Sequence, residues 1–172
     1  IPQQQQQLPQ GTTIRPDLQI RPCGGTVDLA IVSATLNKLT RPGDARVEFE
    51  VRNVGPGSWE AGPGQVIANL AVRNGASGET YTMNVPIAGR RYAPGERVAR
   101  VQSTAIRNAF DTFEFSGYVD MSLSFDPDIA IDANRCNDDS NAANNTFRVD
   151  DRGVQAYLAG RARSRTFRAP GY

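Results

Sequence analysis

Residues 115–149 constrain the fold of this chain most, because they open with a strict alternation of apolar and polar side chains. Such alternation predicts a strand with one buried face and one solvated face. After a turn-rich acidic segment, Phe147 and Val149 restart the pattern, which predicts a hairpin around a long loop. Two strands alone are only marginally stable in water, so the rest of the chain must supply others. The predicted inward positions of the first strand are Phe115, Gly117, Val119, Met121, Leu123 and Phe125.

Further strands are predicted at residues 27–36, 46–52, 66–72, 81–87 and 97–105, whereas residues 106–114 are ambiguous between a loop and one helical turn. Turn residues separate these segments, and Asn74-Gly75 is a strong hairpin signal. Seven strands at this spacing are typical of an immunoglobulin-like sandwich. We therefore predict an all-β, immunoglobulin-like β-sandwich of about seven antiparallel strands over residues 23–151. Extended arms are expected at residues 1–22 and 152–172.

Turn motifs spaced by strands run along most of the chain: Asp28-Leu29, Arg41-Pro42-Gly43-Asp44, residues 47–55, Ala93-Pro94-Gly95-Glu96, Gly117-Tyr118, Asp126-Pro127-Asp128, Ile131, Asn137-Asp138 and Asn144-Asn145-Thr146. Together, over about residues 16–150, they resemble a CARDB-type domain, the bacterial cell-adhesion-related module of immunoglobulin-like build. The resemblance implies the same fold. It also implies a surface or secreted protein, because such modules are common in proteins of that kind.

The composition argues against several classes of function. The chain of 172 residues contains no histidine and one lysine, Lys38, and its 19 basic side chains nearly balance 18 acidic ones. Without histidine, neither a Ser/His/Asp or Cys/His nucleophile nor a histidine-based metal site can form. We predict a protein that is not an enzyme and needs no cofactor, with nucleic acid the least expected partner. No apolar run approaches the roughly 20 residues that span a bilayer, so no membrane span is expected.

Two cysteines, Cys23 and Cys136, each lie in a polar turn beside a predicted strand end. In an oxidising compartment we expect them to pair, and closing so long a loop stabilises a fold by about 4–5 kcal/mol in the chain-entropy model. Two free thiols are the alternative. Because the chain begins with Ile1, we interpret it as mature after removal of a secretory signal, with a shortened sequence as the alternative. The expected location is secreted, periplasmic or at the cell surface.

The N-terminal arm begins with a low-complexity Gln/Pro segment, residues 1–13, which has almost nothing to bury. Ile14, Leu18 and Ile20 then alternate with polar residues and predict a short edge strand, since prolines in this segment exclude a central position. This strand has two possible acceptors: the sheet of its own molecule, or that of a neighbouring molecule by strand addition.

Two central features have both a structural and a functional interpretation. Trp59, the only tryptophan, lies in a Gly/Pro loop and either caps the core or anchors an interface. The loop at residues 126–145 is rich in oxygen-bearing side chains that suit Ca²⁺, although Asp and Asn are also common turn residues. If a cation binds, the first candidate ligands are Asp126, Asp128, Asp132, Asp138 and Asp139.

The C-terminal arm is rich in arginine, with aromatic residues between the charges. A basic arm of this kind can lie along an acidic surface. We expect it to contact the acidic surface of a neighbouring subunit, through residues that include Tyr157, Arg161, Arg163, Arg165 and Phe167.

The function that these features favour is a non-catalytic secreted or cell-surface subunit with a structural or adhesive role. Its terminal arms would join it to other protein chains, as a homo-oligomer or within a larger assembly such as a filament. The alternative is a carbohydrate- or calcium-dependent binding module that serves as an accessory subunit of an extracellular complex.

Overall fold

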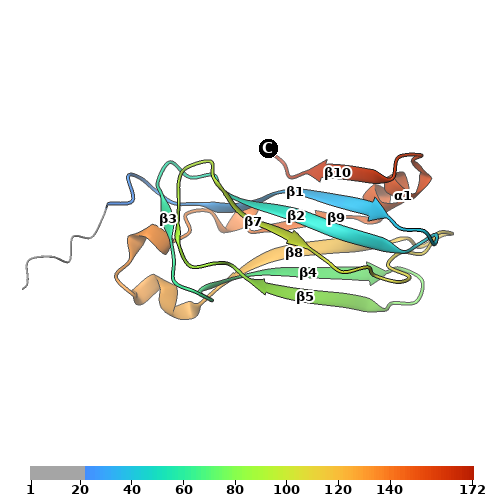
Figure 1. Ribbon diagram of the computed structural model, residues 1–172, viewed down its shortest axis with the longest axis horizontal. Helices are drawn as coiled ribbons and strands as arrows, with labels where there is room; N and C mark the ends of the chain where they lie inside the picture. The colour runs from blue at the N-terminus through green and yellow to red at the C-terminus, as the bar shows by residue number, and fades with distance from the viewer. Residues whose placement is uncertain (1–21) are drawn as a thin grey trace, which may run out of the picture.

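The computed structural model describes residues 22–172, and this part of the chain is mostly β-structure (Figure 1). It contains strands β1 (Leu29–Lys38), β2 (Ala45–Asn53), β3 (Trp59–Glu60), β4 (Val66–Asn74), β5 (Thr80–Pro86), β6 (Arg91–Tyr92), β7 (Arg97–Gln102), β8 (Gly117–Phe125), β9 (Thr146–Val149) and β10 (Ser164–Arg168). The helices are α1 (Asp151–Ala159) and three 3₁₀-helices, η1 (Pro127–Ile131), η2 (Arg135–Asn137) and η3 (Ala142–Asn144). The predictions for Ile14, Leu18 and Ile20 lie outside the described residues.

The strands form two four-stranded sheets, in the orders β10-β1-β2-β7 and β5-β4-β8-β9, and a small β3-β6 pair. Every strand pair in these sheets is antiparallel. The all-β prediction is confirmed. The seven predicted strands correspond to β1, β2, β4, β5, β7, β8 and β9, and the long hairpin that organises the sequence is the β8-β9 pair.

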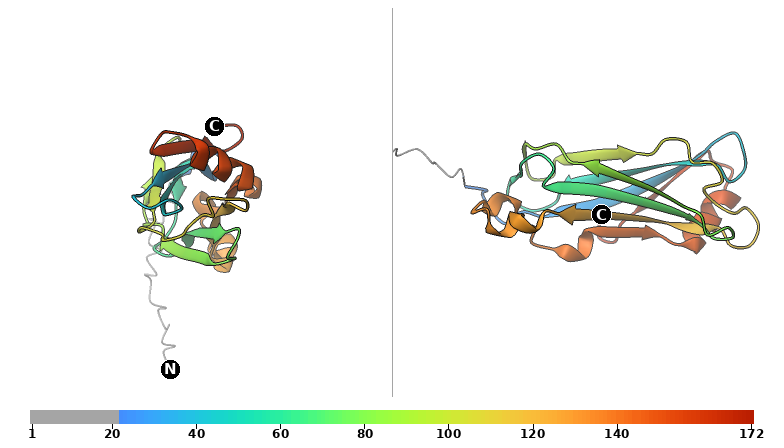
Figure 2. Two further views of the ribbon diagram at one scale, coloured as in Figure 1. Left: turned by 90° about the vertical axis from the view of Figure 1, so that its right-hand side faces the viewer. Right: turned by 90° about the horizontal axis from the view of Figure 1, so that it is seen from below.

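Both four-stranded sheets contribute to one hydrophobic core, which includes Val47 and Phe49 of β2 and Leu70 and Met121 of β4 and β8. Seen along the strands, the sheet that contains β10 and β1 lies above the sheet that contains β4 and β5 (Figure 2, left). Alternation therefore predicted the buried faces of these strands correctly. It failed at Phe115, which is 58% exposed because β8 begins only at Gly117.

One end of the molecule is closed by Trp59 and by the disulfide between Cys23 and Cys136. This disulfide is the predicted bond. Trp59 is 0% exposed and stacks edge to face on Phe125, with ring centroids 5.9 Å apart. Trp59 therefore caps the core, and its interpretation as an exposed interface anchor is wrong.

The prediction of an extended C-terminal arm is also wrong. Asp150 caps α1 by accepting a hydrogen bond from the Gly153 N–H at 2.8 Å, and Val154 and Tyr157 are buried. The chain then returns as β10, which pairs with β1 over residues 164–168 (Figure 1). The apolar residues between the arginines pack on the protein's own core, so this segment is part of the folded body. Within residues 22–172 no helix is both long and apolar enough to cross a membrane.

Candidate interaction surface

Three of the five candidate calcium ligands, Asp126, Asp132 and Asp139, each accept a backbone hydrogen bond. Asp126 and Asp132 accept hydrogen bonds from the N–H groups of Asp128 and Asn134, at 3.0 and 2.7 Å, and Asp139 accepts from Leu29 at 2.9 Å. Two hydrogen bonds lower the pKa of Asp132. The larger effect comes from the side-chain amide of Asn137, and the smaller from the backbone N–H of Asn134.

The structure does not gather the five candidate ligands, Asp126, Asp128, Asp132, Asp138 and Asp139, into one site. Among residues 22–172, no three His, Cys, Asp or Glu side chains form a group that could hold a metal ion. The arrangement is that expected of turn-forming Asp and Asn residues.

The same loop is tied to the start of β1. The Asn144 side chain donates to both carboxylate oxygens of Asp28, at 2.9 and 3.1 Å, and the Asn145 side chain donates to Asp139 at 2.8 Å. Burial raises the pKa of Asp28, and the nearby Asp139 carboxylate adds to this effect. These contacts fix the loop against the sheet.

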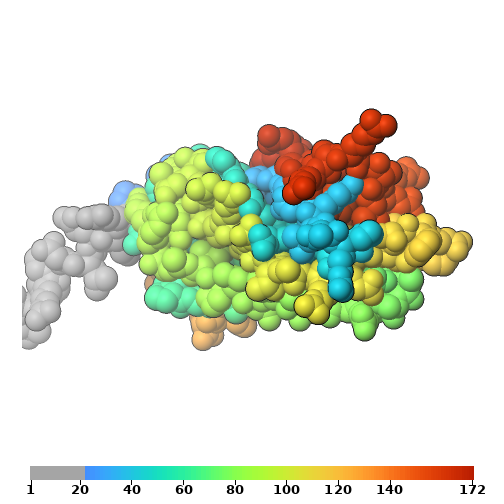
Figure 3. Space-filling view, turned by 45° about the vertical axis from the view of Figure 1, so that its right-hand side comes forward, coloured from blue at the N-terminus to red at the C-terminus, as the bar shows by residue number. Residues whose placement is uncertain are grey.

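An aromatic loop between β7 and β8, residues 111–116, projects from the other end of the molecule (gold in Figure 3). Phe113 is 94% exposed and Phe115 is 58% exposed. Their backbone is nevertheless fixed, because Oδ2 of Asp111 accepts hydrogen bonds from the N–H groups of Phe113, Glu114 and Phe115 at 3.1, 2.9 and 3.2 Å. These bonds, led by that from Glu114, lower the pKa of Asp111.

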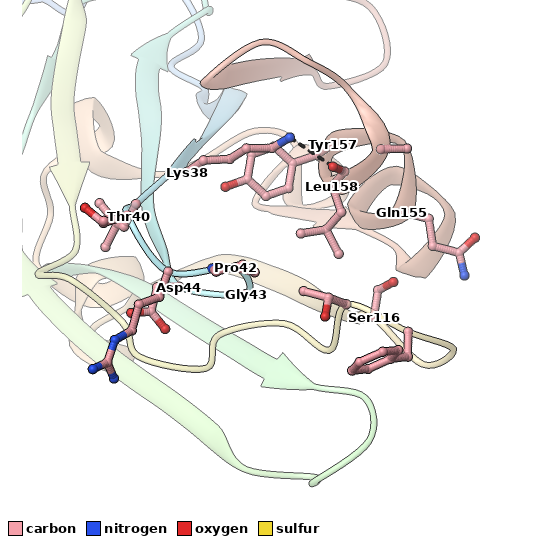
Figure 4. A pocket seen from close by; sticks show the side chains of 14 residues that line it. Lys38, Thr40, Pro42, Gly43, Asp44, Ser116, Gln155, Tyr157 and Leu158 are labelled. Carbon is pink, nitrogen blue, oxygen red and sulfur yellow. Dashed lines mark hydrogen bonds between the residues drawn. The ribbon is translucent and has the colours of Figure 1, made fainter.

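A pocket of about 550 Å³ opens beside the aromatic loop, between that loop, α1 and the β1-β2 turn (Figure 4). Leu158 points from α1 into this space, with Pro42 and Gly43 of the turn on one side and Ser116 on another. Thr112 and Phe113 complete the side formed by the aromatic loop. The pocket therefore combines an apolar floor with an exposed aromatic ring at its edge.

Lys38 and Tyr157 form the inner wall of the pocket. Nζ of Lys38 donates to the carbonyl oxygen of Leu158 at 2.9 Å and to that of Gly160, and it lies 5.4 Å from the centre of the Tyr157 ring. Tyr157 also packs edge to face on Phe110 at 6.0 Å. Its buried hydroxyl has no hydrogen-bond partner, and burial raises its pKa to about 12.

The predicted interface residues of the C-terminal segment are not assembled into one contact surface. Tyr157 is only 2% exposed, and Phe167 packs against the core. Arg165 donates a hydrogen bond to the carbonyl oxygen of Ala156 at 3.1 Å, so it ties β10 to α1. Arg161 and Arg163 are exposed in the turn between α1 and β10.

Sequence reasoning missed Phe113 as a surface residue and placed Phe115 on the buried face of a strand. The available signal was Asp111 two residues before Phe113, since an Asp side chain often bonds to backbone N–H groups just after it in a turn. No protein-family model matches the chain, and neither the curated proteins nor the solved structures include a match.

Proposed function

We propose that this chain is a non-catalytic structural or adhesive subunit of an exported assembly and that it joins to neighbouring protein chains. The observation that carries the proposal is the aromatic loop at residues 111–116. Phe113 lies almost entirely in solvent while Asp111 fixes its backbone. A side chain presented on a fixed backbone loses less conformational entropy when it binds, which favours a contact with a partner.

The proposed architecture is an immunoglobulin-like sandwich of the CARDB type. Supporting it, β1-β2-β7 and β5-β4-β8-β9 correspond to the A-B-E and C′-C-F-G strand orders of immunoglobulin-like domains, with β10 added beside the first strand. The resemblance of the turn motifs to CARDB-type domains also supports a role at the cell surface. The Cys23–Cys136 bond supports export, because disulfides persist mainly in oxidising compartments.

The test compares the wild-type chain with Phe113→Ser and Phe115→Ser variants. We expect wild-type mass in light scattering and sedimentation to rise with concentration, and both variants to weaken this association. Ile131→Ser is the matched control, because Ile131 is 80% exposed but belongs to η1. This 3₁₀-helix (orange, at the left of Figure 1) lies at the end of the molecule opposite the aromatic loop. A wild-type protein that stays monomeric at all concentrations, or variants that associate as strongly as wild type, would contradict the proposal.

A second candidate function is a carbohydrate-binding accessory module. The pocket beside Phe113 favours it, because an exposed aromatic ring with polar neighbours such as Gln155 and Asp44 is suited to a sugar. Isothermal titration with a panel of glycans tests it. Binding that Phe113→Ala abolishes would favour this function over assembly.

A further inference from the structure

The two four-stranded sheets have four edge strands, and β5 differs from the other three. Arg165 and Arg168 lie on β10, Arg97 and Arg100 on β7, and Arg148 on β9, whereas β5 carries no charged residue. Charges on edge strands are a common protection against pairing with further strands. With seven residues, β5 is also the longest of the four edges. Pro86, which has no N–H and would block pairing, is the last residue of β5, so residues 80–85 form the edge best suited to accept another strand.

The backbone groups of β5 that face away from β4 can be identified. The Ile87 N–H donates to the Val66 carbonyl oxygen at 2.9 Å, and the antiparallel register continues without a bulge along β5. Because successive residues of a strand point their backbone groups to opposite sides, those of Thr82 and Asn84 point outward. Within residues 22–172, no strand pairs with β5 on that side.

The inward side chains of β5 are also incompletely covered. Tyr81, Met83 and Val85 pack against the core, yet all three remain partly exposed because no strand of the described chain lies beyond them. An added strand with apolar side chains on the same face would cover them. On the opposite face, Thr80, Thr82 and Asn84 offer polar neighbours.

Residues 14–20 have the sequence that this edge requires. Ile14, Leu18 and Ile20 share one parity with Pro16, and the residues between them are polar. If the apolar side chains lie beside Met83 and its inward neighbours, the residues whose backbone groups face Thr80, Thr82 and Asn84 are Arg15, Asp17 and Gln19. Each of these three residues has an N–H. Pro16, which has none, then faces away from β5, as a proline in an edge strand must.

We propose that β5 accepts residues 14–20 of a second copy of this chain as an added antiparallel strand. This inference rests on the proposed function and names one of the contacts through which the subunits join. Because the donor segment and the acceptor edge are different surfaces, the contact is head-to-tail and can repeat into an open filament.

The direction of β5 favours a second copy over the same molecule. β5 runs toward the end of the body where the described chain begins (Figure 1), and Arg91, shortly after β5, donates to the Pro22 carbonyl oxygen at 3.1 Å. A segment that leads into Pro22 and lies along its own β5 would run parallel to it. Every pair in these sheets is antiparallel, and parallel pairing is slightly less stable per residue, whereas a second copy is free to pair antiparallel.

The test measures sedimentation and amide hydrogen exchange of the full chain over a range of concentrations. We expect the amides of Thr82 and Asn84 to gain protection as concentration rises. Thr82→Pro removes an outward N–H that β4 does not use, so it should abolish this gain at Asn84, whereas the control Thr82→Val keeps the N–H and should retain it. Leu18→Asp changes the proposed donor segment and no residue of β5, so it should also abolish the gain.

Four outcomes would overturn the inference. Protection of Thr82 and Asn84 that does not depend on concentration would mean pairing within one molecule. Exposed amides in the associated protein would mean that β5 stays free. If Phe113→Ser weakens association but Thr82→Pro and Leu18→Asp leave it unchanged, strand addition is rejected and the proposed function is kept. If the wild-type chain never associates, both are rejected.

Discussion

Gly117 lies against the carbonyl oxygen of Arg73 so closely that a Cβ atom at this position would be 1.9 Å from that oxygen. Its φ is +107°, a backbone conformation that side chains other than glycine rarely adopt. This contact joins the end of β4 to the start of β8, directly after the aromatic loop. It sets the point at which alternation begins and explains why Phe115 lies outside the strand.

Replacing Gly117 with alanine should lower the free energy of unfolding by more than about 3 kcal/mol, because the new Cβ forces the two strands apart. Gly95→Ala is the matched control. Gly95 also has a positive φ, +77°, but a Cβ atom added there would have no other atom within 4 Å, so a loss of about 1 kcal/mol is expected. Urea denaturation measures both values, and equal losses would show that conformation rather than the Arg73 contact decides the cost.

The buried hydroxyl of Tyr157 gives a second prediction. A buried polar group without a partner costs about 1–3 kcal/mol, so Tyr157→Phe should raise the free energy of unfolding by about 1 kcal/mol. Tyr118→Phe is the control, because Tyr118 lies on the outward face of β8 and should change stability little. A loss of stability in Tyr157→Phe would indicate that the hydroxyl has a partner in solution.

Tyr157 also predicts a dependence of stability on alkaline pH. Its pKa is raised to about 12 in the folded protein from an unfolded value of about 10. Because the folded protein keeps the hydroxyl proton more tightly than the unfolded chain, deprotonation favours unfolding. The stability of the fold is therefore unaffected by this group below pH 10 and falls as pH rises toward 12. The stability advantage of Tyr157→Phe should therefore grow over this interval. A constant difference between the two proteins would contradict the cause assigned to the shift.

The pKa of Asp111 predicts how the aromatic loop responds to acid. Backbone hydrogen bonds lower this pKa below the ordinary value of 3.8. The stabilisation of the loop by the ionised carboxylate is therefore complete above pH 3.8 and is lost as pH falls through the pKa of Asp111 in the folded protein. The protection factors of the Phe113, Glu114 and Phe115 amides, relative to the intrinsic exchange rate at each pH, should fall in that acidic range, and Asp111→Ala should show low protection already at neutral pH. Asp126→Ala serves as the control, because it removes a comparable bond from an Asp side chain to a backbone N–H, that of Asp128, outside the aromatic loop. Protected amides in Asp111→Ala would show that the loop is fixed by other contacts.

The sequence predicted the parts of the fold that depend on alternation and turn chemistry. The inward sides of β2, β4 and β8 follow directly from apolar residues at every second position, such as Val47, Phe49 and Val51. The disulfide could also be predicted, because the chain has two cysteines and each lies in a polar turn. Very short strands such as β3 and β6, with two residues each, carry no periodic signal and could not be found in this way.

The C-terminal segment was misjudged because its composition suggested a solvated basic arm. What decides its position is nonlocal: Val154 and Tyr157 find a place at the end of the core, and Lys38, distant in sequence, binds the last carbonyl groups of α1. The aromatic loop was missed for the opposite reason. Apolar content normally indicates burial, but here the Asp111 turn reverses the chain before the strand begins.

Removing the disulfide provides the last prediction. Cys23 and Cys136 are separated by 113 positions, and a loop of that length corresponds to about 4–5 kcal/mol of stability in the chain-entropy model. The Cys23→Ser/Cys136→Ser double variant should lose this amount in urea denaturation, and reduction of the wild-type protein should reproduce the loss. The variant itself is the control, because reductant should leave it unchanged. Cys136 lies in η2, which contacts β3. The variant should therefore also expose the Trp59 end of the core and shift the tryptophan fluorescence to longer wavelength. A variant as stable as wild type would mean that the contacts of Asn134 with Glu60 and of Asp139 with Leu29 are sufficient to hold the acidic loop in place.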